Sequence, residues 1–186
     1  MLAYVFWHWP QPAVNTQAYI SRLAAFHETL NANKPEGFHH STVFSINGSS
    51  WLHAQNSAFE DWYLLDDSAA LDRLNLAAVT GKCEQPHHLV AKDAADGTAG
   101  LYRLRIGTSN LSNKRNAIWF SKPADLSYKD FFDRIESQCS RETSLWQRQM
   151  TLGPTTEFCL LSEKDAELQI GLVGQDVTLQ LIWSGE

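Results

Sequence analysis

The order in which two kinds of hydrophobic pattern alternate constrains this sequence more than any other feature. Four segments rich in β-branched and aromatic residues are separated by Pro, Gly, Asn or Asp, as is typical of β-strands between turns. These segments are 2–9, 38–46, 59–65 and 101–106. Two other segments carry apolar residues at steps of three and four, the spacing of one face of an α-helix. The predicted order is strand, helix, strand, strand, helix, strand.

Capping residues place the two helices. The first begins at Asn15 or Thr16, and its buried face is predicted from four apolar residues spaced by 4, 3 and 4. These are Tyr19, Leu23, Phe26 and Leu30. The second begins after Asp66 and Asp67, which are expected to serve as caps, and ends at Gly81. A polar loop containing Pro86-His87-His88 is predicted to lead to the fourth strand.

The same pattern starts again after a loop rich in Ser and Asn. A strand over 117–120, a helix capped by Ser127 and strands over 145–152 and 157–161 follow. Segments 168–173 and 177–183 are predicted to form a hairpin, with at most one helical turn at 163–166. The chain is therefore predicted to have two related halves, 1–107 and 114–186, with the second helix of the second half shortened or missing.

This organisation resembles a single-chain version of the dimeric α+β barrel superfamily. The resemblance rests on element order and on two matching openings, 4–9 before Pro10 and 118–122 before Pro123. It implies an α+β fold of two fused ferredoxin-like (βαββαβ-type) halves, whose antiparallel sheets form a barrel-like pseudo-dimer. The superfamily includes antibiotic-biosynthesis-type monooxygenases, EthD-like proteins and chlorite-dismutase-like haem proteins. No member's motif matches this sequence residue by residue.

Composition argues against several classes of protein. The 186 residues include 15 Lys and Arg against 21 Asp and Glu, a net charge of −6 without a run of like charges, so a nucleic-acid partner is disfavoured. No apolar stretch reaches the roughly 18 residues of a membrane span, and residues 2–9 are too few for a secretory leader. The three cysteines lack CxxC spacing. We expect reduced thiols, a cytoplasmic location and no membrane partner.

Cofactor motifs are missing from the sequence. It contains no GxGxxG, GxxxxGK[ST], HExxH or GxSxG, so no cofactor is predicted, with haem as a secondary alternative. His87 and His88 lack an evident third ligand, so no metal is predicted; their loop is interpreted as a lid over a cavity. His27 lacks a second histidine four residues later and is interpreted as lying at the margin of a helix face.

Strand alternation points to one sheet face as a candidate site. On the first strand, Val5, Trp7 and Trp9 are predicted to pack under the helices. The alternate residues 4, 6 and 8 then lie on the opposite face of the sheet. The same reasoning on the second and fourth strands extends this opposite face. It comprises Tyr4, Phe6, His8, His39, Ser41, Arg103 and Arg105. Aromatic walls with a few polar groups are typical of small-molecule pockets.

The residue types suggest roles. His8 or His39 could act as a catalytic base, while Arg103 and Arg105 could anchor a carboxylate or phenolate. Tyr4 and Phe6 would be walls and Ser41 a polar contact. Asp61 could orient a histidine if it points inward. The alternative is that this face of the sheet is exposed to solvent and has no function. A shift of one residue in the strand register would exchange His39 for His40 on this face.

Two functions remain open. The resemblance implies a small-molecule enzyme, such as a cofactor-independent monooxygenase or isomerase acting on an aromatic or polyketide-like substrate. The alternative is a non-catalytic module that binds a ligand or another protein. A homodimer formed through exposed aromatic residues or strand edges is compatible with either function.

Overall fold

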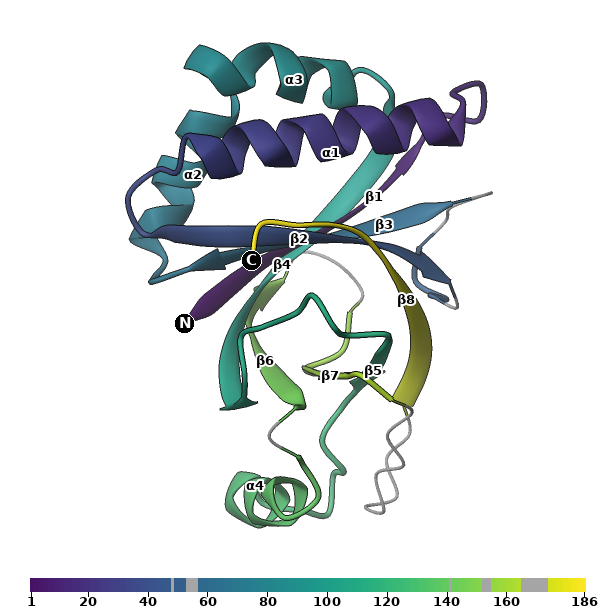
Figure 1. Ribbon diagram of the computed structural model, residues 1–186. Helices are drawn as coiled ribbons and strands as arrows, with labels where there is room; N and C mark the ends of the chain where they lie inside the picture. Colours follow the sequence, from purple (N-terminus) through teal and green to yellow (C-terminus); the bar gives the residue numbers. More distant parts are fainter. Residues whose placement is uncertain (48, 53–56, 141, 152–154, 165–173) are drawn as a thin grey trace.

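Eight antiparallel strands close into one barrel in the computed structural model, which describes residues 1–47, 49–52, 57–140, 142–151, 155–164 and 174–186 (Figure 1). The strands are β1 (Leu2–Pro10), β2 (Phe38–Asn47), β3 (Ala58–Leu65), β4 (Ala94–Gly107), β5 (Asn116–Phe120), β6 (Ser144–Thr151), β7 (Phe158–Ser162) and β8 (Gly174–Ser184). The helices are α1 (Thr16–Ala32), α2 (Ala69–Ala78), α3 (Gly81–Ala91) and α4 (Tyr128–Glu136). None of these described helices is both long and apolar enough to cross a membrane.

The strand order around the barrel confirms the predicted fold class. The order is β1-β3-β2-β8-β5-β7-β6-β4, closing from β4 back to β1. The first four strands are therefore contiguous as β4-β1-β3-β2, and the last four as β8-β5-β7-β6. Each set has its fourth, first, third and second strand side by side, the ferredoxin-like order. The β2–β8 and β4–β6 pairs join the two sets into one barrel.

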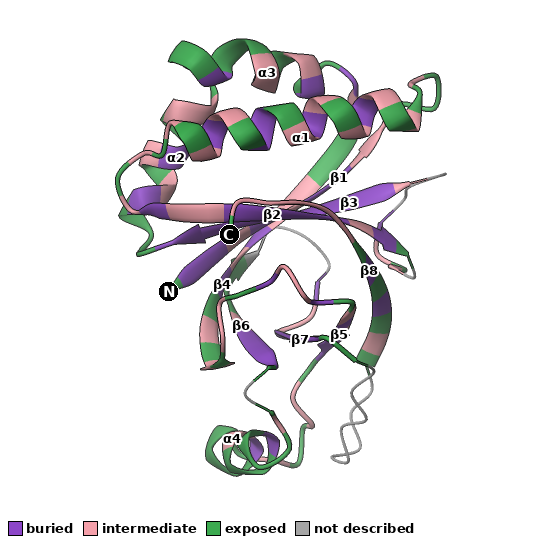
Figure 2. Ribbon diagram, in the orientation of Figure 1, coloured by how far each residue is buried: buried purple, intermediate pink, exposed green. Residues whose placement is uncertain are grey.

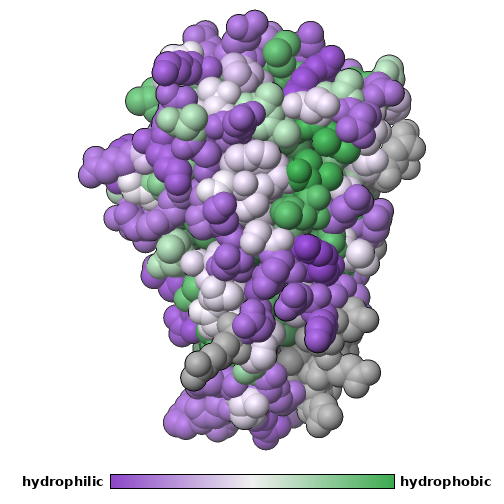
Figure 3. All heavy atoms as spheres, in the orientation of Figure 1, coloured by the Kyte–Doolittle hydropathy of each residue, from purple (hydrophilic) through white to green (hydrophobic). Residues whose placement is uncertain are grey.

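Three apolar clusters hold this arrangement together. Trp7, Trp62, Trp119 and Trp146 are fully buried inside the barrel. A second cluster packs α1, α2 and α3 against the outer face of the β1–β3–β2 sheet, and a third packs α4 against β5, β6 and β7. Figure 2 shows the consequence for β3, which is buried along its whole length because both of its faces are covered. Hydrophilic side chains cover most of the face shown in Figure 3.

The two rows of the first strand are separated as predicted, but the side assigned to each row is wrong. Val5 and Trp7 face the barrel interior, and Trp9 packs against the same cluster. The helices instead cover the other row, to which Tyr4 and Phe6 belong. Alternation distinguishes two faces of a strand, but which face lies inside depends on barrel closure.

The region predicted as a polar loop contains a helix. Gly81, expected to end the second helix, opens α3 with a positive φ of 58°. Pro86 lies inside α3, where it removes one backbone donor. The buried side chains of α3, Cys83 and Val90, belong to the second cluster, which lies between the helices and the sheet and is called the helix-side cluster below. This packing stabilises α3 despite the proline.

The structure decides one further prediction and leaves another outside the residues it describes. Asn15 is the N-cap of α1, its side chain accepting from the Ala18 N–H at 3.0 Å, which settles the choice between Asn15 and Thr16. The predicted strand over 168–173 and the end of the turn predicted at 163–166 lie outside the described residues.

Candidate functional site

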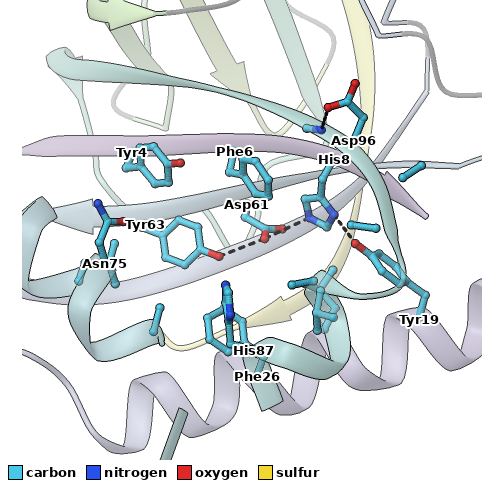
Figure 4. A pocket seen from close by; sticks show the side chains of 18 residues that line it. Tyr4, Phe6, His8, Tyr19, Phe26, Asp61, Tyr63, Asn75, His87 and Asp96 are labelled. Carbon is cyan, nitrogen blue, oxygen red and sulfur yellow. Dashed lines mark hydrogen bonds and ion pairs between the residues drawn. The ribbon is translucent and has the colours of Figure 1, made fainter. Parts of the chain in front are cut away.

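A cavity of about 430 Å³ lies between the outer face of the sheet and the helices α1, α2 and α3 (Figure 4). Its sheet wall includes Tyr4, Phe6 and His8 of β1, Asp61 and Tyr63 of β3, and the first residues of β4, 94–97. Its helix wall includes Tyr19, Phe26, Asn75 and His87. A volume of this size and a largely apolar lining that includes several aromatic rings are typical of small-molecule sites.

The aromatic row of β1 is fixed by its neighbours. Phe6 stacks on His8 with ring centroids 5.1 Å apart, and His8 stacks on Phe59 at 5.6 Å. Gly97 makes room for the Phe6 ring, since a Cβ at Gly97 would lie 2.5 Å from Phe6 Cζ. Phe6 therefore lies close to the backbone of β4 at Gly97 and stacks on the imidazole of His8 from one side.

Asp61 is the centre of a buried polar network. Its Oδ2 lies 3.2 Å from His8 Nε2 and 3.1 Å from His27 Nε2, and it accepts from the Tyr63 hydroxyl at 3.2 Å. His8 and His27 are only 1% and 0% exposed, and Asp61 is 2% exposed. A buried carboxylate needs such partners, because an unpaired charge in the interior is very costly.

Each histidine carries the network one step further. His8 Nδ1 lies 2.7 Å from the Tyr19 hydroxyl, and His27 Nδ1 lies 2.8 Å from Ser41 Oγ. When a ring carries a single proton, the ionised Asp61 favours that proton on Nε2, and Nδ1 then accepts from the neighbouring hydroxyl. The result is a chain from Asp61 through His8 to Tyr19, and a second chain from Asp61 through His27 to Ser41.

The electrostatics assign the protonation states. Burial raises the pKa of Asp61, but the positive charge and hydrogen bonds that His8 and His27 can supply outweigh burial and hold this pKa below its ordinary value. Burial first, and the Asp61 charge second, raise the pKa of Tyr4, Tyr19 and Tyr63. The carboxyl is therefore ionised at neutral pH, while the phenols keep their protons and act as hydrogen-bond donors.

A second buried carboxyl lies on the other side of the same strand. Glu60 faces the barrel interior, where Trp7 Nε1 donates to it at 2.7 Å and Trp62 Nε1 at 2.5 Å. Burial raises the pKa of Glu60 to about 7, although the two indole hydrogen bonds act to lower it. Glu60 does not line the cavity.

The predicted site residues fall into two groups. Tyr4, Phe6 and His8 line the cavity, and Ser41 lies behind it in the Asp61 network. The other three lie elsewhere.

His39 is outside the cavity, at the surface, with Nε2 2.6 Å from Asp66. A shift in β2 pairing between Phe38 and Ser41 separates it from the row that contains Ser41. Arg103 donates to Gln149, and Arg105 lies 4.9 Å from the centre of the Phe132 ring. No Lys or Arg is among the described residues that line the cavity.

Sequence reasoning missed several members of the site. His27 is fully buried and central to the network, although it was expected at the margin of its helix. The available signal was its position four residues after Leu23, on the buried face. Tyr63 lies two residues from Asp61 and therefore on the same strand face, which could have linked them. No local pattern connects either residue to His8.

Comparison with known proteins supports the architecture. No family model and no curated protein matches the sequence. A protein assigned as a monooxygenase from Lactobacillus acidophilus NCFM superimposes with a TM-score of 0.59 at 12% identity, over 98% of this chain and 95% of its own. The chain has the dimeric α+β barrel fold.

Two further solved structures agree with this fold. An anthrone oxidase-like protein has a TM-score of 0.54 at 7% identity, over 96% of this chain and 91% of its own. A protein assigned as a chlorite dismutase has a TM-score of 0.53 at 10% identity, over 97% and 95%. At such low sequence identities the structural likeness shows the fold alone. The reaction must be argued from the site.

The cavity does not fit haem, the secondary alternative. Both ring nitrogens of His8 and of His27 are engaged by protein partners, so neither is available as an axial ligand. His87 could supply one nitrogen, but no described Lys or Arg lines the cavity to pair with the haem propionates. Among the described residues there is also no group of three side chains suited to a metal ion.

Proposed function

We propose that this chain is an enzyme that binds a small aromatic or polyketide-like molecule in the cavity and removes a proton from it without a cofactor. The observation that carries this proposal is the chain of close polar contacts from Asp61 through His8 to Tyr19, with 3.2 Å from Asp61 Oδ2 to His8 Nε2 and 2.7 Å from His8 Nδ1 to the Tyr19 hydroxyl; all three residues line the cavity. Such a chain from a carboxylate through an imidazole to a hydroxyl orients a general base and stabilises its protonated form.

The proton transfer follows from the protonation states. When an acidic O–H or C–H of the substrate reaches the Tyr19 oxygen, that substrate bond breaks and its proton bonds to the oxygen. The proton originally on the Tyr19 hydroxyl moves to His8 Nδ1. The two heavy atoms, the Tyr19 oxygen and His8 Nδ1, are 2.7 Å apart. Asp61 stabilises the resulting imidazolium through Nε2. A positioned general base of this kind contributes about 10²–10⁴-fold to a rate.

The substrate anion can then react in two ways. Reprotonation at another carbon completes an isomerisation. Reaction with O₂ converts a CH₂ group into a carbonyl group, with one oxygen atom retained and the other released as water. The likeness to an anthrone oxidase-like protein and to a protein assigned as a monooxygenase supports the second outcome.

The predicted residues take different places in this proposal. His8 is the base, Tyr4 and Phe6 are aromatic walls, and Ser41 holds His27 against Asp61. Because His39, Arg103 and Arg105 lie outside the cavity, the proposal gives them no part in the reaction.

Anthrone provides the test, because its CH₂ group, which two aromatic rings conjugate with the ketone across the central ring, is acidic and its oxidation to anthraquinone changes the absorbance. We expect the wild-type protein to accelerate this oxidation in air, and His8→Gln and Asp61→Asn to lower kcat by about 10²-fold or more. His39→Gln is the matched control and should keep the wild-type rate. Unchanged turnover in His8→Gln would contradict the proposal.

One observation favours the non-catalytic alternative. Both ring nitrogens of His8 and of His27 are used within the protein, so the network could serve the fold alone. A ligand-binding module would bind anthrone in calorimetry without forming anthraquinone. An enzyme would do both, and only its turnover would depend on His8.

A further inference from the structure

The helix wall of the cavity carries a histidine that the proton-transfer chain does not use. His87 of α3 points into the cavity from the side opposite His8 and Asp61 (Figure 4). Its ring is half-buried and makes an edge contact with Phe26, with centroids 5.4 Å apart and an interplanar angle of 65°. In the part of the chain that the structure describes, neither nitrogen of this ring has a hydrogen-bond or ion-pair partner.

The polar groups around Asp61, by contrast, are already paired with one another. The hydroxyls of Tyr19 and Tyr63 already donate to His8 and Asp61, and both nitrogens of His8 are engaged. A polar group that lines a largely apolar cavity is stabilised only when a partner occupies the space in front of it. His87 is therefore a strong candidate for a contact with a bound molecule.

The surroundings of His87 decide which kind of partner it takes. Burial, and then the neighbouring His88, lower the pKa of His87, so its ring is neutral at pH 7 and one of its nitrogens accepts hydrogen bonds. The cavity also contains the ionised Asp61 and carries Asp96 at its exposed rim, without a lining Lys or Arg. These charges disfavour an anionic group and favour a neutral donor such as a hydroxyl.

We propose that His87 is a specificity-determining residue that accepts a hydrogen bond from a hydroxyl or N–H group of the ligand. This inference rests on the proposed function, because the opposite end of the same ligand would face Tyr19 and His8. The ligand class is then a flat aromatic molecule with a polar group at each end, one held by the sheet wall and one by the helix wall. Phe6 and Phe26 would contact its faces or edges.

The test compares two probes by titration calorimetry, 1-naphthol with one hydroxyl and 1,5-dihydroxynaphthalene with a second hydroxyl at the far end. We expect the wild-type protein to bind the diol about tenfold more tightly, the effect of one satisfied hydrogen bond. His87→Phe keeps an aromatic ring but has no nitrogen, and should abolish this preference while changing 1-naphthol affinity by no more than about threefold. His87→Gln, which keeps an acceptor, should restore part of it.

His88→Phe is the matched control, since His88 is exposed and does not line the cavity. This variant should keep the full preference for the diol. A preference that survives in His87→Phe would overturn the inference, as would a wild-type protein that binds neither probe or binds both equally.

A second measurement avoids substitution altogether. Diethyl pyrocarbonate transfers an ethoxycarbonyl group to an unprotonated, accessible imidazole nitrogen, releasing ethanol and CO₂, and mass spectrometry locates the product. The diol should protect His87 but not His88 in the wild-type protein. Equal modification of His87 with and without the diol would contradict the inference. Neither experiment uses turnover, so failure of the His8-dependent reaction would be recognised separately.

Discussion

At the residue scale, Glu60 and Asp61 show how two adjacent carboxyls acquire opposite properties. They are consecutive on β3 and therefore face opposite sides of the sheet. Asp61 faces two histidines, which favour the ionised carboxylate and lower its pKa through the positive charge that each can take up and through their ring N–H groups. Glu60 has only two neutral indole donors inside the barrel, and burial raises its pKa to about 7. Both carboxyls are buried, so the type of partner, imidazole for Asp61 and indole for Glu60, separates the two groups.

This difference predicts how stability depends on pH. The pKa of Glu60 is raised from 4.5 in the unfolded chain to about 7, so the folded state binds the proton more tightly. The corresponding stabilisation is complete below the unfolded value and is lost as the pH rises toward 7, by about 3 kcal/mol. Asp61 has a lowered pKa, so its contribution is lost only in stronger acid and does not affect this interval.

Urea unfolding at several values between about pH 4.5 and pH 7.5 measures the effect. Glu60→Gln should remove most of the decline that the wild-type protein shows. Because the new amide would direct an N–H toward an indole N–H, the variant can be less stable at every pH, and the slope is the quantity to compare. An identical slope in both proteins would contradict the assignment.

At the scale of elements, α1 positions one residue of each hydrogen-bonded chain. Tyr19 and His27 both belong to α1. Asn15 caps the N-terminus of this helix, with its Oδ1 3.0 Å from the Ala18 nitrogen.

Asn15→Ala should lower the free energy of unfolding by about 1 kcal/mol, because it leaves a backbone donor unsatisfied, whereas Asn15→Asp should retain the cap. Thr16→Ala is the matched control and should change stability by less than about 0.5 kcal/mol. Denaturant titrations of the three variants would check this, and equal losses in Asn15→Ala and Thr16→Ala would contradict it.

At the scale of the whole molecule, the barrel closes only when both halves are present. In residues 1–107 alone, β2 loses its partner β8 and β4 loses β6, and the barrel-facing Trp7 and Trp62 lose much of their covering. We expect this fragment to pair its β2 with β4 of a second copy, or to aggregate, because open strand edges and apolar faces associate. Size-exclusion chromatography and near-ultraviolet circular dichroism would show this, whereas a monomeric fragment that unfolds cooperatively would contradict it.

The same closure bears on the predicted homodimer of the full chain. The described barrel strands form a continuous ring, so they offer no strand edge for a second copy. Association would have to use the surface, where Leu76 and Met150 are among the exposed apolar side chains. The homodimer stays a prediction.

The sequence by itself determined the α+β fold class, the order of the strands over residues 1–120 and the two rows of the first strand, because these depend on local spacing and capping. It separated Tyr4, Phe6 and His8 from Val5 and Trp7 correctly. Only the tertiary structure decided which row faces the barrel interior, since a period of two is the same on either side of a sheet. Packing against the helix-side cluster likewise decided that α3 forms around Pro86.

The candidate site shows the same division. His8, His27 and Asp61 come from β1, α1 and β3, and no spacing in the sequence relates them. Their meeting depends on barrel closure and on how α1 lies across the sheet. His39 and His40 could not be ranked from the sequence, because an irregularity in strand pairing shifts the register of β2 at that point. Local chemistry therefore identified the types of residue, and long-range packing decided which of them share a cavity.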